Sequence, residues 1–165
     1  MSFLGGADGP TSVFVAGDLG MGWINVFGAI IVIIILIPNI IYGLKNRGIR
    51  NLCTNKVMNI LERIGRYGCM LLMIFNVGLS KFAYPSVAAF LAYFLGNALL
   101  LVMYIFFWVL YAKKKTMFRA IALSAIPTAI FLLSGISLLY ILLIVFAVIF
   151  GVAHNYVTYV NHKSI

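Results

Sequence analysis

Acidic residues are nearly absent from this chain. Its 165 residues include three Asp or Glu against twelve Lys or Arg, and the three carboxylates are Asp8, Asp18 and Glu62. Nucleophile-elbow, zinc-protease, phosphate-binding-loop and paired-carboxylate motifs are missing from the sequence. Because an active site needs convergent acids, bases or a metal, we expect no enzymatic activity and no catalytic residues.

Cysteine and histidine are scarce as well, with two of each. Cys53, Cys69, His154 and His162 show no metal-ligand spacing, so we expect no bound transition metal. The cysteines are interpreted as small apolar packing residues rather than as a disulfide. His154 lies near the end of the last apolar segment, where interfacial packing and a proton-relay role are both open.

Charged residues make up 9% of the chain and hydrophobic residues 64%, whereas a soluble protein has about 25% charged residues. The mean hydropathy is +1.12. A soluble core cannot use so much apolar surface, so lipid must be the main solvent. The net charge of +9 then indicates membrane orientation rather than nucleic-acid binding, because the basic residues flank apolar runs. We expect the lipid bilayer as the partner surface and no nucleic acid.

The apolar runs predict an all-α fold: a polytopic integral membrane helix bundle with about five transmembrane helices. The expected crossings are residues 23–44, 60–79, 85–112, 117–133 and 138–159. The break at residues 134–137 is weak. Four crossings is the main alternative, if the N-terminal helix or the helix at 117–133 is re-entrant. Residues 1–22 are expected to be a short or re-entrant Gly-rich segment, and residues 23–165 a single-domain bundle.

Basic residues fall almost entirely on one side of these expected helices. The one exception is Lys81, so the positive-inside rule places the N-terminus outside and the C-terminus inside. The inner basic residues are Lys45, Arg47, Arg50, Lys56, Arg63, Arg66, Lys113, Lys114, Lys115, Arg119 and Lys163. We expect a multi-pass protein of the cell membrane, of bacterial plasma-membrane type.

A few polar side chains fall inside or beside the apolar segments. Glu62 and Arg66 have i,i+4 spacing and are expected to form an ion pair at the membrane interface. Asn39, Asn76 and Asn97 are expected to donate and accept hydrogen bonds between helices. These residues are therefore the predicted polar contacts of the bundle.

Local signals predict where two helices begin and which face one of them packs. Thr54 is predicted to cap the second helix, and Pro85 suits the first position of the third. Ala88, Ala92 and Gly96 place small residues at four-residue spacing, which predicts close contact with another helix along that row.

The N-terminal segment holds the least ordinary pattern. Asp8, Gly9, Pro10 and Thr11 predict a turn that opens a short helix, with Asp8 as its cap. Glycines permit unusual backbone angles there, and freed carbonyls beside a carboxylate and hydroxyls suit a hard cation. A capped external turn without an ion is the alternative.

Residues 5–15, GGADGPTSVFV, resemble the GGADGPT-type motif of the beta subunit of sodium-translocating decarboxylases, of the oxaloacetate, methylmalonyl-CoA and glutaconyl-CoA type. The resemblance implies that Asp8 ligates sodium and that Thr11 and Ser12 supply further oxygens. It also implies that the motif lies in an interrupted membrane segment. That family's subunit is much longer and carries the motif in mid-chain, and the rest of this chain shows none of its other membrane elements.

Two functions follow from these features. The chain is either a cation (sodium)-associated transport component or accessory subunit, or a structural or regulatory membrane protein that docks on other subunits without an ion site. Five helices give little room for a transport pathway, so we expect a homo-oligomer or other membrane subunits as partners. In the transport interpretation, Asn76 and Asn97 are the in-membrane polar groups able to face Asp8.

Overall fold

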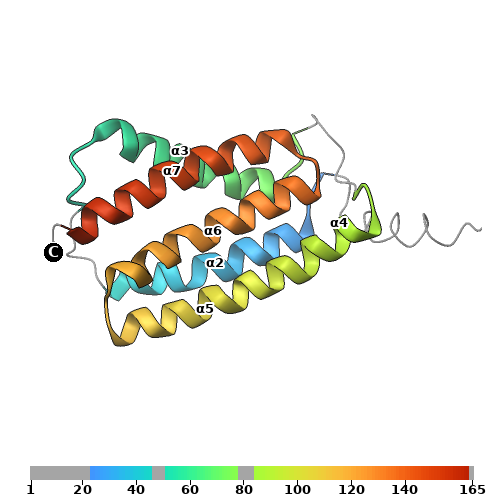
Figure 1. The fold of residues 1–165 in the computed structure, drawn as a ribbon. Coiled ribbons are helices and arrows are strands. Elements are labelled where there is room, and N and C mark those ends of the chain that lie inside the picture. Colours follow the sequence, from blue (N-terminus) through green and yellow to red (C-terminus); the bar gives the residue numbers. More distant parts are fainter. Residues whose placement is uncertain (1–22, 46–50, 78–83, 164–165) are drawn as a thin grey trace, which may run out of the picture.

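The computed structural model describes residues 23–45, 51–77 and 84–163 (Figure 1). These residues are almost entirely helical, and their only extended pairing is one antiparallel bridge between Ile24 and Phe75. The elements are α2 (Val26–Lys45), α3 (Lys56–Ile74), α4 (Val87–Leu91), η1 (Ala92–Gly96), α5 (Asn97–Lys113), α6 (Met117–Ser137) and α7 (Ile141–Lys163). Because α4, the π-helical turn η1 and α5 are continuous, the described chain forms five rods.

The predicted all-α membrane bundle is confirmed. The helix α2, the rod at 87–113, α6 and α7 are each long and apolar enough to cross a membrane. The central helix is α6, which packs against α5 on one side and α7 on the other (Figure 1). The helix α3 lies antiparallel to α7 but carries charged residues among its first turns.

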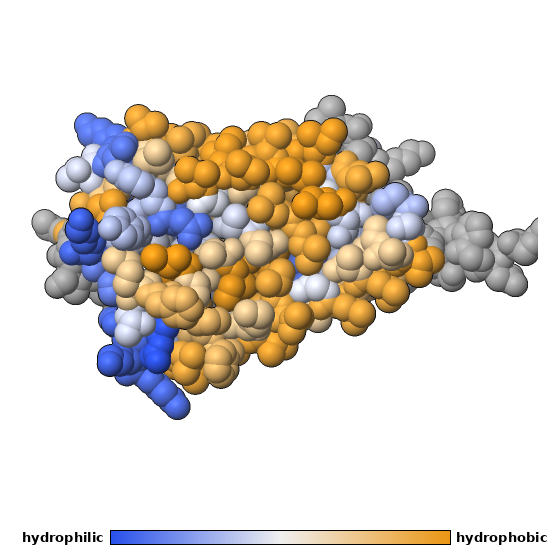
Figure 2. Space-filling view, in the orientation of Figure 1, coloured by the Kyte–Doolittle hydropathy of each residue, from blue (hydrophilic) through white to orange (hydrophobic). Residues whose placement is uncertain are grey.

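One end of the bundle is basic, as the charge pattern predicts. The backbone N–H groups of Leu52 and Cys53 donate to Asn161 Oδ1, so the chain before α3 meets the last turns of α7. The turn after α5 lies over the last turn of α2, where Lys115 Nζ is 5.5 Å from the Tyr42 ring centre. Figure 2 shows hydrophilic residues gathered at this end and an apolar belt beside it.

Two glycines let α3 approach α7 closely. A Cβ built on Gly65 would lie 2.8 Å from the Phe150 Cα, and one on Gly68 would lie 2.1 Å from the Phe146 ring. Real Cβ atoms do not tolerate such distances, so Gly65 lets the backbones of α3 and α7 meet and Gly68 leaves room for the Phe146 ring. Close approach through small residues is the usual way for helices to associate when lipid removes the hydrophobic driving force.

Both predicted helix starts are wrong by one or two residues. The cap of α3 is Asn55, whose side chain accepts from the Met58 N–H, rather than Thr54. The cap of α4 is Ser86, whose hydroxyl accepts from Ala89 N–H, so Pro85 lies outside the helix. Both observed caps belong to the residue types that satisfy the first free N–H groups of a helix.

The predicted break at residues 134–137 is also wrong, because α6 continues through Ser137. The turn comes at Leu139, which adopts a left-handed φ of 50°. The N–H of Tyr140 donates to the Gly135 carbonyl at 2.8 Å, and that of Leu139 to the Ile136 carbonyl at 3.1 Å. This pair of bonds is a Schellman motif. It closes the carbonyl end of α6 without the glycine that usually takes the left-handed position.

The predicted row of small residues is confirmed at one position only. A Cβ on Gly96 would lie 2.6 Å from the Leu133 side chain of α6, but Ala88 and Ala92 are exposed. The contacts of this rod with α6 come mainly from η1 and α5, and Ala88 lies in α4, nearer the start of the rod.

We expect cysteines introduced at Pro85 and Lys114 to be labelled from opposite sides of the membrane. Both positions are exposed and lie at opposite ends of the rod at 87–113, whereas the native Cys53 and Cys69 are buried. A membrane-impermeant maleimide should label Pro85→Cys in intact cells and Lys114→Cys only after permeabilisation. The unmodified chain is the background control. Labelling of both positions from one side would contradict the orientation.

Gly65→Ala should lower the detergent melting temperature, with a cost of about 1–3 kcal/mol, because the new methyl group meets the Phe150 backbone. Gly43→Ala is the matched control: it lies in α2 with nothing within 4 Å of the added Cβ. Its better helix propensity should leave the melting temperature unchanged or raised. Equal melting of the two variants would show that α3 and α7 do not pack through Gly65.

Candidate functional site: a polar cluster between α3 and α7

Glu62 is the sole carboxylate in the described residues, and it is buried, with 8% of its surface exposed. It lies in the second turn of α3, on the face that packs against α7. Arg66, one turn further along, pairs with it, so the predicted i,i+4 ion pair is confirmed. A buried carboxylate needs such a partner, because its desolvation is not otherwise compensated.

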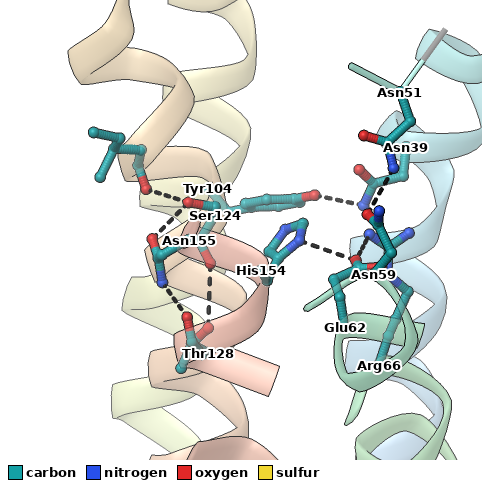
Figure 3. Close-up of polar contacts among 12 residues, drawn as sticks. Asn39, Asn51, Asn59, Glu62, Arg66, Tyr104, Ser124, Thr128, His154 and Asn155 are labelled. Atoms are coloured by element: carbon teal, nitrogen blue, oxygen red, sulfur yellow. Dashed lines mark hydrogen bonds and ion pairs between the residues drawn. The ribbon is translucent and has the colours of Figure 1, made fainter. Parts of the chain in front are cut away.

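His154 of α7 completes this cluster (Figure 3). Its Nδ1 lies 3.1 Å from Glu62 Oε1, and its ring stacks on Phe150 with centroids 4.7 Å apart. Nδ1 makes no aligned hydrogen bond, so this contact is an ion pair only when His154 is protonated. His154 therefore both packs against Phe150 and contacts the Glu62 carboxylate. The partner of His154 could not be read from the sequence, because it lies on a helix distant in the chain.

A second polar group ties α6 to α7 beside His154 (Figure 3). The Ser124 hydroxyl donates to Asn155 Oδ1 at 2.6 Å, and Asn155 Nδ2 donates to the Gly151 carbonyl at 2.7 Å. The Thr128 hydroxyl donates to the Ser124 carbonyl at 3.2 Å. These neutral bonds satisfy the hydroxyl groups of the buried Ser124 and Thr128.

Asn39 and Asn97 make the interhelical bonds that the sequence predicts. Asn39 Nδ2 donates to the Tyr104 hydroxyl at 2.8 Å, which joins α2 to α5. Asn97 Nδ2 donates to Ser134 Oγ at 3.1 Å, which joins α5 to α6. At Asn76, the backbone N–H donates to the Trp23 carbonyl at 2.9 Å.

Other parts of the predicted cation site fall outside the described residues. Asp8, Thr11 and Ser12 all lie there, as does Asp18. The described residues 23–45, 51–77 and 84–163 contain no group of three His, Cys, Asp or Glu able to hold a metal ion. The one carboxylate that the structure describes is Glu62, and its contacts are with Arg66 and His154.

The cluster can neutralise charge and can hold a proton. Arg66 offsets the Glu62 carboxylate, and a protonated His154 adds a second favourable charge at 3.1 Å. Glu62 thus faces two basic side chains rather than open space. It is poorly placed to ligate a cation, because a cation would have to displace one of them.

Removing Glu62 should destabilise the bundle by about 1–3 kcal/mol, below the cost for a fully buried pair because Arg66 is partly exposed. Glu62→Ala leaves Arg66 without its partner, so Glu62→Ala/Arg66→Ala should melt higher than the sum of the two single losses predicts. Melting in detergent measures all three variants. Strictly additive losses would show that the pair contributes no coupling.

Compared with known proteins, the chain matches no family model, no curated protein and no solved structure. The assignment of function therefore rests on the chain's own residues.

Proposed function

We propose that this small integral membrane protein is a sodium-associated transport component or accessory subunit of a bacterial plasma membrane, with Asp8 as the cation ligand. The observation that carries the proposal is the motif at residues 5–15, which combines a carboxylate, hydroxyls and glycines. Hard cations prefer such oxygen ligands. Thr11 and Ser12 would supply the neutral oxygens.

The described structure supports Asp8 as the cation ligand, because Glu62, another carboxylate of the chain, is already paired with basic side chains. The chain has three carboxylates, and Glu62 is engaged by Arg66 and His154. A protein carboxylate for a cation must therefore come from Asp8, Asp18 or a partner. Of the two aspartates, only Asp8 lies within the motif and has hydroxyl residues three and four positions away.

The packing supports a subunit that works with others. Several polar side chains inside the described bundle pair across helices, as Asn97 Nδ2 does with Ser134 and Ser124 with Asn155, while Asn97 Oδ1 is buried without a hydrogen-bond partner. Such pairs hold helices together and do not line a wet path. A second copy of the chain or other membrane subunits would complete any pathway for the ion.

The test compares melting of the purified full chain in sodium and in potassium at matched ionic strength. Sodium should raise the melting temperature in proportion to the logarithm of its concentration above the dissociation constant. Asp8→Asn should remove the difference between the two cations. Asp18→Asn, which removes the same charge outside the motif, should preserve it.

Equal melting of the wild type in both cations would contradict the sodium site. The alternative function, a structural or regulatory protein that docks on other membrane subunits, would then be favoured. Loss of the sodium effect in both aspartate variants would also contradict the role of Asp8, because a general charge effect would explain it.

A further inference from the structure

A run of three lysines ends α5 and begins the turn to α6. Lys113 is the last residue of α5, and Lys114 and Lys115 follow it in the turn. Lys45 ends α2, and all four side chains are exposed. Their positions at the ends of two helices place a concentration of positive charge at one corner of the basic end, which we call the lysine corner.

Aromatic packing brings the two helix ends together at this corner. The Tyr42 ring of α2 lies 5.3 Å from the Trp108 ring and 6.1 Å from the Tyr111 ring of α5, measured between centroids. Lys115 Nζ then lies 5.5 Å from the Tyr42 ring centre. The corner is therefore a packed arrangement of α2 and α5 with lysines at its outer edge.

Arg119 fixes the backbone of the turn and adds a further positive charge near it. Its Nη1 donates to the Leu110 carbonyl at 2.6 Å and to the Lys114 carbonyl at 3.0 Å. The Leu110 carbonyl also accepts from the Lys114 N–H at 3.1 Å, so Arg119 adds a second hydrogen bond to the carbonyl that closes α5. Arg119 thus holds the backbone of the turn while the three lysines stay exposed.

No acidic side chain of the described bundle neutralises this corner. The carboxylate of Glu62 is engaged by Arg66 on α3, and no described lysine makes an ion pair. Like charges at close range repel, so an anion from outside the described bundle would stabilise them. The positive charge of the lysine corner is therefore not neutralised by any side chain of the described residues.

We propose that the lysine corner binds the headgroup phosphate of an anionic phospholipid. Tyr42, Trp108 and Tyr111 lie directly beside the lysines, and such amphipathic rings belong at the headgroup level of a membrane. On α5, Phe106 and Val109 are exposed and apolar, which offers a surface for the acyl chain. Basic residues beside membrane helices attract anionic lipids in this way.

An acidic protein partner would use the same charge but would not need the apolar surface. The lipid is favoured because Phe106 and Val109 lie seven and four residues before Lys113, on the same face of α5. An acyl chain can follow this face from a phosphate held by the lysines. This inference is independent of the sodium site at Asp8, since it uses residues of α2, of α5 and of the turn that follows α5.

Trp108 gives a direct readout, because it lies at the corner. The full chain with Trp23→Phe would be reconstituted into phosphatidylcholine vesicles that contain brominated phosphatidylglycerol or, separately, brominated phosphatidylcholine. Bromine quenches indole fluorescence on contact, so the ratio of quenching gives the relative affinity of the two lipids. We expect at least about five-fold preference for phosphatidylglycerol, which is the effect of a single lysine near an anionic surface.

Lys113→Gln/Lys114→Gln should reduce that preference severalfold while leaving the Lys115 contact with Tyr42 in place. Lys56→Gln/Lys163→Gln is the matched control, because it removes equal charge from exposed positions outside the corner. It should retain the preference. Added salt should weaken the wild-type preference, whereas inorganic phosphate at matched ionic strength should not compete with the lipid.

Equal quenching by the two lipids in the wild type would overturn the proposal and would favour an acidic protein partner. Equal losses in the two double variants would also overturn it, because a diffuse surface charge would then explain the effect. Melting temperatures of both variants show whether the fold is intact, and Lys114→Gln alone provides a milder change at the same corner.

Discussion

The contact between α3 and α7 is the constraint on which this bundle depends. α3 carries charged residues into an otherwise apolar assembly, and a lone carboxylate in lipid would be costly. Gly65 and Gly68 remove the side chains that would hold the two helices apart. The approach brings Glu62 to His154, while Arg66 pairs with Glu62 from the next turn. Steric and electrostatic requirements are thus met by one helix face.

Neutral hydrogen bonds set the register of the other helices. The bonds from Asn39 to Tyr104 and from Asn97 to Ser134 each join two helices. Such a bond is made only when the helices have the correct height and rotation, so it selects one arrangement among many apolar contacts of similar energy. Apolar packing supplies cohesion, whereas these pairs supply specificity.

The sequence predicts the features that depend on local composition. Apolar length predicts the helices, charge asymmetry predicts the basic end, and i,i+4 spacing predicts the pair of Glu62 and Arg66. The partner of His154 was not predictable, because it depends on how α3 packs. The sequence predicts the end of α6 too early, because the left-handed residue that ends this helix is Leu139 and not the glycine that usually takes this position. The π-helical turn likewise left no signal in the spacing of small residues.

Helix α2 connects two ends of the bundle that differ in charge. It begins at the end where the Trp23 carbonyl accepts from the Asn76 N–H, and it ends at Lys45, which belongs to the lysine corner. Because α2 is long and apolar enough to cross a membrane, Trp23 and Lys45 lie at opposite ends of a membrane-length helix. The proposed lipid site contains no residue before Tyr42, so its charge comes from one end of the bundle and does not depend on what Asp8 binds.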